Sequence, residues 1–171
     1  MARQKPVFFD WALWFEWIMA TTLGWVIGRL LFPNLALVTI GLALGILQWF
    51  ILQHRIRQPW RWIVVTTLGW SVGAMFLFIA LPNGMDFVAG LVMGLTMGSA
   101  QWLILRREVY WAGWWLIINV VAWTTGMALL PGFLLTGAIV GAITGFAIEL
   151  LLRYPKPGET ASAGDDGGWA E

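Results

Sequence analysis

A short pattern of residues occurs three times in this chain, and the repetition restricts its fold more than any other feature of the sequence. In each copy a Trp, a small polar residue, a small residue, a second Trp and a Gly keep a fixed spacing. Residues three or four positions apart share one face of a helix, so each copy predicts a helix with the same recurring face. The copies span residues 17–28, 62–73 and, more loosely, 115–126.

A second pattern follows each copy and predicts a second helix. Two Gly residues four positions apart precede Gln48 and Gln101, each followed by Trp, while the third copy has Ile148 at this place. Sequences rich in Pro, Asn and Gly separate the two helices of each unit and favour tight turns. The sequence therefore predicts three helix hairpins, with repeats at about 11–55, 60–107 and 111–153.

Composition and the length of the apolar runs place these helices in a membrane. Of the 171 residues, 60% are hydrophobic and 11% are charged, whereas about a quarter of the residues of a soluble domain are charged. A membrane-spanning helix needs about 20 mostly apolar residues. Six stretches qualify: 11–32, 35–52, 62–81, 87–105, 112–130 and 133–152.

We therefore expect an all-α integral membrane protein with six transmembrane helices, arranged as three repeated hairpins of parallel orientation. The membrane domain covers residues 1–153. Residues 154–171 are rich in Gly, Ala, Ser and acidic residues, a composition typical of a disordered tail.

The basic residues predict the orientation of the spans. Of the ten Lys and Arg residues, only Arg29 approaches the opposite side of the expected membrane. Cytoplasmic loops carry an excess of Lys and Arg, so we expect both termini in the cytoplasm and the protein in the inner (plasma) membrane. The basic set is Arg3, Lys5, Arg55, Arg57, Arg61, Arg106, Arg107, Arg153 and Lys156.

Tryptophan is concentrated toward the same side. Trp is enriched at membrane–water interfaces, so we interpret these residues as a one-sided belt that fixes the depth of the protein. The alternative is a rim that docks a partner or an amphipathic ligand. The residues are Trp11, Trp14, Trp17, Trp49, Trp60, Trp62, Trp102, Trp111, Trp114 and Trp115.

Glycines at intervals of four residues predict close helix packing, because small side chains let two backbones approach each other. The alternative is a stripe that lines a narrow pore or lies against a flat cofactor. The expected packing residues are Gly24, Gly28, Gly41, Gly45, Gly69, Gly73, Gly90, Gly94, Gly98, Gly137, Gly141 and Gly145.

Polar residues recur on the same helix faces and form the candidate site. Thr21 and Gln48 reach a similar depth, and Thr66 with Gln101 repeats the arrangement. An amide in hydrocarbon needs a partner, which favours interhelical hydrogen bonds. The alternative is a converging layer that binds a solute or an ion. The candidates are Thr21, Gln48, Thr66, Gln101, Asn119 and Glu149, the last expected beside the glutamines.

The motifs of common enzymes are missing from the sequence. It contains no HExxH, GxSxG or Walker A pattern, no Cys, and a single histidine, His54. Its carboxylates are too scattered to nominate a general acid and base. We expect no enzymatic activity, no metal site and no nucleic-acid partner, and the sequence identifies no cofactor.

The two repeated patterns together resemble a group of bacterial multi-pass membrane proteins that have no assigned activity and are built from repeated Trp- and Gly-rich helix hairpins. Residues 101–107, Gln-Trp-Leu-Ile-Leu-Arg-Arg, match the ending of that motif closely, and residues 48–52 match it less well. The third copy departs at Ile148 and Glu149. The resemblance covers all six expected spans and implies their fold.

Two classes of function are compatible with these features. The first is a non-enzymatic membrane protein that packs against itself, as a homo-oligomer, or against a larger membrane assembly as an accessory subunit. The second is a small-solute transporter, channel or substrate-capture subunit that uses the polar layer. The first is favoured because each polar residue has a packing explanation.

Overall fold

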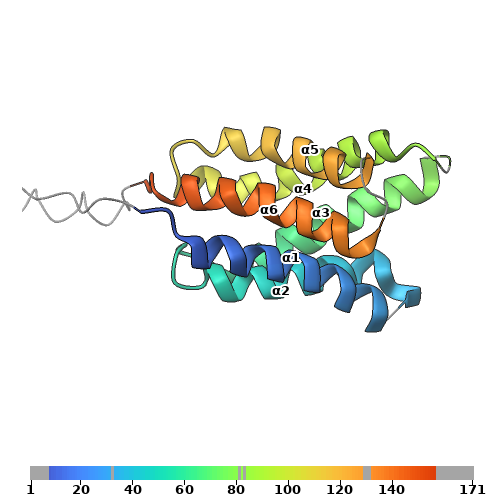
Figure 1. Ribbon diagram of the computed structural model, residues 1–171, viewed down its shortest axis with the longest axis horizontal. Coiled ribbons are helices and arrows are strands. Elements are labelled where there is room, and N and C mark those ends of the chain that lie inside the picture. Colours follow the sequence, from blue (N-terminus) through green and yellow to red (C-terminus); the bar gives the residue numbers. More distant parts are fainter. Residues whose placement is uncertain (1–7, 32, 81, 83, 129–131, 157–171) are drawn as a thin grey trace, which may run out of the picture.

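The computed structural model describes residues 8–31, 33–80, 82, 84–128 and 132–156, and these residues are almost entirely helical (Figure 1). The prediction of an all-helical chain is therefore confirmed for the described residues, which contain no strand beyond one isolated bridge. The elements are α1 (Trp11–Leu31), the 3-10 turn η1 (Pro33–Leu35), α2 (Ala36–Leu52), α3 (Trp60–Ala80), α4 (Asp86–Glu108), α5 (Gly113–Ala128) and α6 (Phe133–Leu152).

Local chemistry defines where the helices begin and end. Asp10 is the N-cap of α1, because its carbonyl oxygen accepts the first helical bond from Trp14 and its carboxylate accepts a bond from the Leu13 N–H at 3.0 Å. Pro33 begins the short turn to α2. Gly84, at a φ of +89°, lies in the connection to α4, a backbone conformation that costs glycine little.

The six α-helices of the described residues close into a ring. Each helix packs against its neighbours in the chain, and α1 also packs against α6. The two ends of the described chain lie at the same end of the bundle as the α2–α3 and α4–α5 connections (Figure 1). We call this the basic end, because it carries all the described Arg and Lys residues except Arg29: Arg55, Arg57, Arg61, Arg106, Arg107, Arg153 and Lys156.

Four helical segments of the described chain are long and apolar enough to cross a membrane. They are Pro33–Leu52, Trp60–Ala80, Asp86–Glu108 and Leu134–Leu152. The remaining helices are α1, which contains the charged residues Glu16 and Arg29, and α5, which has 16 residues. At a rise of about 1.5 Å per residue, α5 is shorter than a hydrocarbon core of about 30 Å.

The first residues of the tail expected from residue 154 onward pack against the end of α4. The Tyr110 N–H donates to the Tyr154 carbonyl at 3.1 Å, and the Lys156 N–H donates to the Glu108 carbonyl at 2.8 Å. These bonds form a short antiparallel bridge that composition alone does not reveal. Residues 157–171 of the expected tail lie outside the described residues, as do Arg3 and Lys5.

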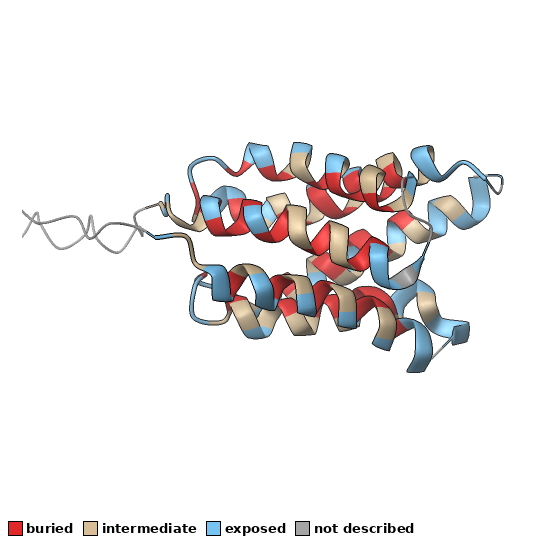
Figure 2. Ribbon diagram, in the orientation of Figure 1, coloured by how far each residue is buried: buried red, intermediate tan, exposed pale blue. Residues whose placement is uncertain are grey.

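The interior contains two stacked apolar clusters, and the buried face of each helix points toward the middle of the bundle (Figure 2). The cluster nearer the basic end includes Leu13, Trp17, Leu52, Trp62, Leu105, Trp115 and Ile148. The second cluster includes Trp25, Leu44, Trp70, Met93, Met97, Trp123 and Val140. The predicted polar residues other than Glu149 lie between these two clusters.

Candidate functional site

The repeated pattern brings its polar position to the interior of the bundle. On α1, Trp17, Thr21 and Gly24 follow at intervals of four and three residues and so share one helix face. All three are buried. On α3 the corresponding Thr66 is fully buried, and on α5 Asn119 is 2% exposed.

Gln48 joins three helices through its amide group. Its Nε2 donates to Thr21 Oγ1 on α1 at 3.2 Å, and its Oε1 accepts a bond from Trp62 Nε1 on α3 at 2.9 Å. Gln48 is 4% exposed. Both ends of this buried amide are therefore satisfied by neighbouring side chains, as burial in an apolar environment requires.

Gln101 makes the same pair of bonds in the next part of the ring. Its Nε2 donates to Thr66 Oγ1 on α3 at 3.0 Å, and its Oε1 accepts a bond from Trp115 Nε1 on α5 at 3.1 Å. Sequence analysis placed each Gln beside a Thr but did not include the two Trp donors. Each glutamine links its own expected hairpin to the first helix of the next one.

In the third repeat a threonine, one turn earlier on α6, takes the role that the glutamine has in the first two repeats. Ile148 stands where a third Gln would be, and Trp17 Nε1 donates instead to Thr144 Oγ1 at 3.0 Å. Sequence analysis missed Thr144, although a signal was present. In the repeat alignment, Thr144 occupies the place of the apolar Leu44 and Met97, so a polar residue appears where the glutamine is lost.

Asn119 satisfies its amide locally. Its Nδ2 donates to the Trp115 carbonyl oxygen on its own helix at 2.9 Å. Unlike Thr21 and Thr66, it accepts no bond from a glutamine, because Ile148 offers none. The polar contacts of the third repeat therefore differ from the glutamine contacts of the first two repeats.

Two triangles of tryptophans enclose the polar layer. Trp17, Trp62 and Trp115 meet pairwise with ring centroids 6.0 to 6.2 Å apart. Trp25, Trp70 and Trp123 meet pairwise with ring centroids 5.5 to 6.1 Å apart. Eight residues separate the two triangles along α1, which corresponds to about 12 Å of helix.

This arrangement corrects the interpretation of three of the ten tryptophans as part of an interfacial belt. Trp17, Trp62 and Trp115 are at most 1% exposed and form the centre of the bundle. The physical reason is that each indole N–H finds an acceptor inside, so burial leaves no polar group unsatisfied. Trp11, Trp60, Trp111 and Trp114 are exposed near the basic end, where a belt would lie.

Little space remains between the two triangles. The cavity there measures about 10 Å³ and is lined by residues of both triangles, by Leu44, Met97 and Val140, and by the polar side chains Thr21, Gln48, Gln101, Asn119 and Thr144. A single water needs about 10 to 15 Å³ measured in this way. The cavity can therefore take at most one water-sized occupant.

Glu149 lies apart from this layer, contrary to the expectation that it adjoins the glutamines. Its Oε1 accepts bonds from Arg153 Nε at 3.0 Å and from the Asp10 N–H at 3.0 Å. Glu149 follows Ile148, whose side chain faces the interior, so the next residue points toward the start of α1. The carboxylate anchors that start to the end of α6.

The glycines lie where neighbouring helices approach closely. A Cβ added at Gly94 would come within 2.8 Å of the Asn119 carbonyl oxygen on α5. One added at Gly141 would come within 2.8 Å of Ile18 Cα on α1. Each of the twelve glycines named from the sequence faces atoms of an adjacent helix in this way, and none of them lines the central cavity.

No protein-family model, curated protein or solved structure matches this chain. The resemblance to Trp- and Gly-rich multi-pass proteins therefore stays a prediction from the sequence.

Proposed function

We propose that the chain is a six-span membrane protein whose three hairpins, α1–α2, α3–α4 and α5–α6, are arranged in parallel around one central axis. The order of the ring and the glycine contacts support this proposal. Gly41 on α2 faces α3, Gly94 on α4 faces α5, and Gly141 on α6 faces α1. The second helix of each hairpin thus uses glycine against the first helix of the next.

In the proposed orientation the basic end faces the cytoplasm and both termini lie on that side. The chain contains no Cys, so single cysteines can report the topology directly. A membrane-impermeant thiol reagent should label Asn34→Cys in intact cells and Gln58→Cys only after permeabilisation. Labelling of Gln58→Cys in intact cells would rule this orientation out.

The protein acts, in this proposal, without catalysis, as an accessory or packing subunit of a membrane assembly or as a homo-oligomer. The observation that carries the proposal is the closure of the polar layer. Both amide groups of Gln48 and Gln101 are occupied by protein partners, and the cavity beside them has room for at most one water. A layer of this kind stabilises the bundle and leaves its outer surface to meet other molecules.

That outer surface is strongly apolar. Leu68, Val72 and Phe76 on α3 are each more than half exposed, and so are Ile117 and Val121 on α5. A continuous apolar surface suits contact with lipid chains or with helices of a partner. The test is mass spectrometry of the protein after gentle extraction from its own membrane. We expect a second copy or a partner protein at fixed stoichiometry, whereas a monomer that retains a small solute would contradict the proposal.

The alternative, a small-solute transporter or channel, would need a path through the two tryptophan triangles. Such a path requires Trp17, Trp62 and Trp115 to separate and to break three indole hydrogen bonds. The polar lining of the central cavity is the feature that this alternative would use. Melting of Gln101→Leu in detergent, combined with mass spectrometry of bound small molecules, distinguishes the two functions.

A further inference from the structure

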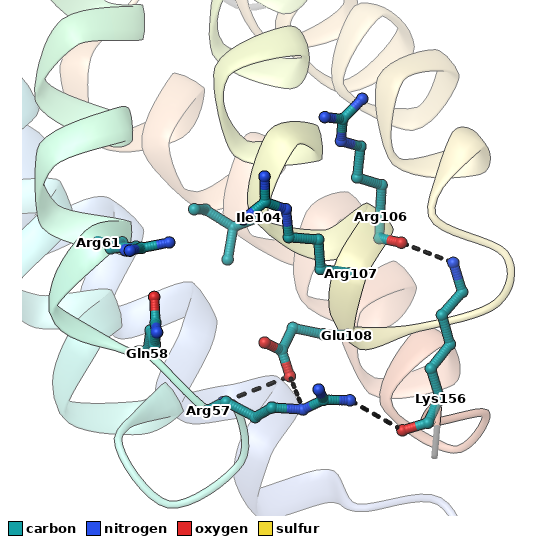
Figure 3. Close-up of a pocket in the computed structure, with 8 residues that line it drawn as sticks. All are labelled: Arg57, Gln58, Arg61, Ile104, Arg106, Arg107, Glu108 and Lys156. Atoms are coloured by element: carbon teal, nitrogen blue, oxygen red, sulfur yellow. Dashed lines mark hydrogen bonds and ion pairs between the residues drawn. The ribbon is translucent and has the colours of Figure 1, made fainter. Parts of the chain in front are cut away.

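A second cavity lies at the basic end, lined by residues of the α2–α3 connection, of α3 and of α4. It is larger and more basic than the central cavity. It measures about 480 Å³ and is lined by Arg57, Gln58, Arg61, Ile104, Arg106, Arg107, Glu108 and Lys156 (Figure 3). Five of these side chains are basic and one is acidic. Binding sites for small molecules and headgroups have volumes of about 300 to 1,000 Å³.

The one carboxylate among the described lining residues is already engaged. Glu108 Oε2 accepts a bond from the Arg57 N–H at 3.3 Å and lies 3.7 Å from Arg57 Nε. Arg57 Nη2 also donates to the Lys156 carbonyl oxygen at 3.2 Å, and Lys156 Nζ donates to the Arg106 carbonyl oxygen at 2.6 Å. These bonds, drawn in Figure 3, build one wall of the cavity from three separate segments of the chain.

Arg61 and Arg107, like Arg106, carry positive charge that Glu108 does not neutralise. Figure 3 shows the Arg61 side chain extending from α3 toward the α4 residues. Arg61 lies over the Trp60 ring at 5.6 Å, and neither Arg61 nor Arg107 forms an ion pair with another described residue. Two guanidinium groups that face one cavity favour an anion with several oxygens, and a phosphate group is the usual partner of this geometry.

The surroundings of the cavity indicate an anion that carries an apolar part. Ile104 lines it directly. Val64, one turn beyond Arg61 on α3, and Leu103, one turn before Arg107 on α4, are 45% and 47% exposed. An acyl chain can lie along these exposed residues on the outer surface, away from the basic end, while the headgroup remains at the arginines. Arg106 lies over the Trp102 ring at 5.1 Å, and such aromatic residues are typical of the membrane interface.

We propose that this cavity binds the phosphate headgroup of an anionic phospholipid. The inference rests on the membrane topology proposed above, which puts the basic end at the level of the cytoplasmic headgroups. Basic pockets between transmembrane helices on that side bind anionic headgroups in other membrane proteins. The site would give the protein a preference for phosphatidylglycerol over zwitterionic phosphatidylcholine.

The test compares lipid binding to the full chain and to charge variants by native mass spectrometry, in detergent with equimolar phosphatidylglycerol and phosphatidylcholine. Arg61→Gln and Arg107→Gln remove charges from the cavity. Arg55→Gln is the matched control, because Arg55 lies at the same end but pairs with Asp10 and lies outside the cavity. Arg57 and Lys156 are left unchanged, since they hold the wall together.

We expect the unmodified chain to retain phosphatidylglycerol preferentially and each cavity variant to lower that preference about fivefold. The double variant should abolish it, while Arg55→Gln should leave it nearly unchanged. Arg61→Lys with Arg107→Lys, which keeps both charges, should retain most of the preference. Melting temperatures close to that of the unmodified chain would show that the variants are folded.

Four results would overturn the proposal. The first is an unchanged preference in the folded double variant, and the second is an equal loss in Arg55→Gln. The third is displacement of the lipid by millimolar inorganic phosphate, which would identify a site for a soluble phosphate. A chain that ends at Lys156 should bind like the full chain. The fourth result is tighter binding by this shorter chain, together with no lipid preference in the full chain, which would assign the cavity to the acidic residues 157–171 instead.

These outcomes are separate from a failure of the topology. If Gln58→Cys were labelled in intact cells, the basic end would face the other side of the membrane. The lipid preference and its loss in the arginine variants would remain measurable in detergent.

Discussion

Trp62 donates its indole N–H to the Gln48 side chain at 2.9 Å, across the boundary between the first and the second expected hairpin. Neither residue is more than 4% exposed. The same relation joins Trp115 to Gln101. In both pairs the tryptophan, whose side chain is mostly apolar, donates the hydrogen bond that satisfies the buried glutamine on the preceding helix.

This relation predicts an energetic coupling between Gln48 and Trp62. Gln48→Leu leaves the indole N–H without its acceptor, and Trp62→Phe leaves the amide oxygen without its donor. In a double-mutant cycle measured by unfolding in detergent, we expect a coupling of about 0.6 to 1.7 kcal/mol, the range for interhelical hydrogen bonds in membranes. Gln48→Leu combined with Trp60→Phe is the control, since Trp60 is exposed, and should show no coupling.

The close approach of α4 and α5 predicts that replacing Gly94 by Ala lowers the stability of the protein, whereas replacing Gly113 by Ala does not. Gly94→Ala places a Cβ within 2.8 Å of the Val120 nitrogen and so forces the two backbones apart. We expect a loss of about 1 to 3 kcal/mol in the free energy of unfolding. Gly113→Ala is the matched control, because an added Cβ there meets no atom within 4 Å. Equal stability of the two variants would contradict the packing role.

The start of α1 predicts a dependence of stability on pH. The hydrogen bond from the Leu13 N–H is the main cause that lowers the pKa of Asp10 below 3.8, with Arg55 adding to it against the opposing effect of burial. Because the folded-state pKa is lowered, the stabilisation is present above pH 3.8 and is lost as the pH falls through the folded-state value. The melting temperature of the unmodified chain should therefore exceed that of Asp10→Asn near neutral pH, and the two melting temperatures should converge in acid.

The sequence predicts the helices well because their spacing signals are local. Each described helix lies within a few residues of its expected stretch, since Pro33 and Gly84 mark the turns and the apolar runs have defined ends. The depth of Thr21 and Gln48 could be calculated from the helical rise alone. Their hydrogen bond needs only the packing of adjacent helices within one hairpin.

The features that the sequence did not predict depend on how separate helices pack against one another. The burial of Trp17 was missed because tryptophan is typical of membrane interfaces, and the acceptor for its indole comes from α6 at the other end of the chain. Glu149 was placed beside Gln101 on the basis of sequence adjacency, but neighbouring residues of a helix point in different directions. The basic cavity combines Arg61 and Arg107 from separate helices, and no linear motif contains both.

The central claim is that the polar layer holds the bundle together and does not bind a solute. The most direct measurement combines melting in detergent with mass spectrometry of bound small molecules for Gln101→Leu, with Gln53→Leu at the end of α2 as the control. The claim predicts that Gln101→Leu leaves the Trp115 indole unpaired, loses about 1 to 3 kcal/mol of stability and melts several degrees lower. The content of bound small molecules should be unchanged. A variant that melts like the unmodified chain but loses a bound solute would contradict the claim and establish the layer as a solute site.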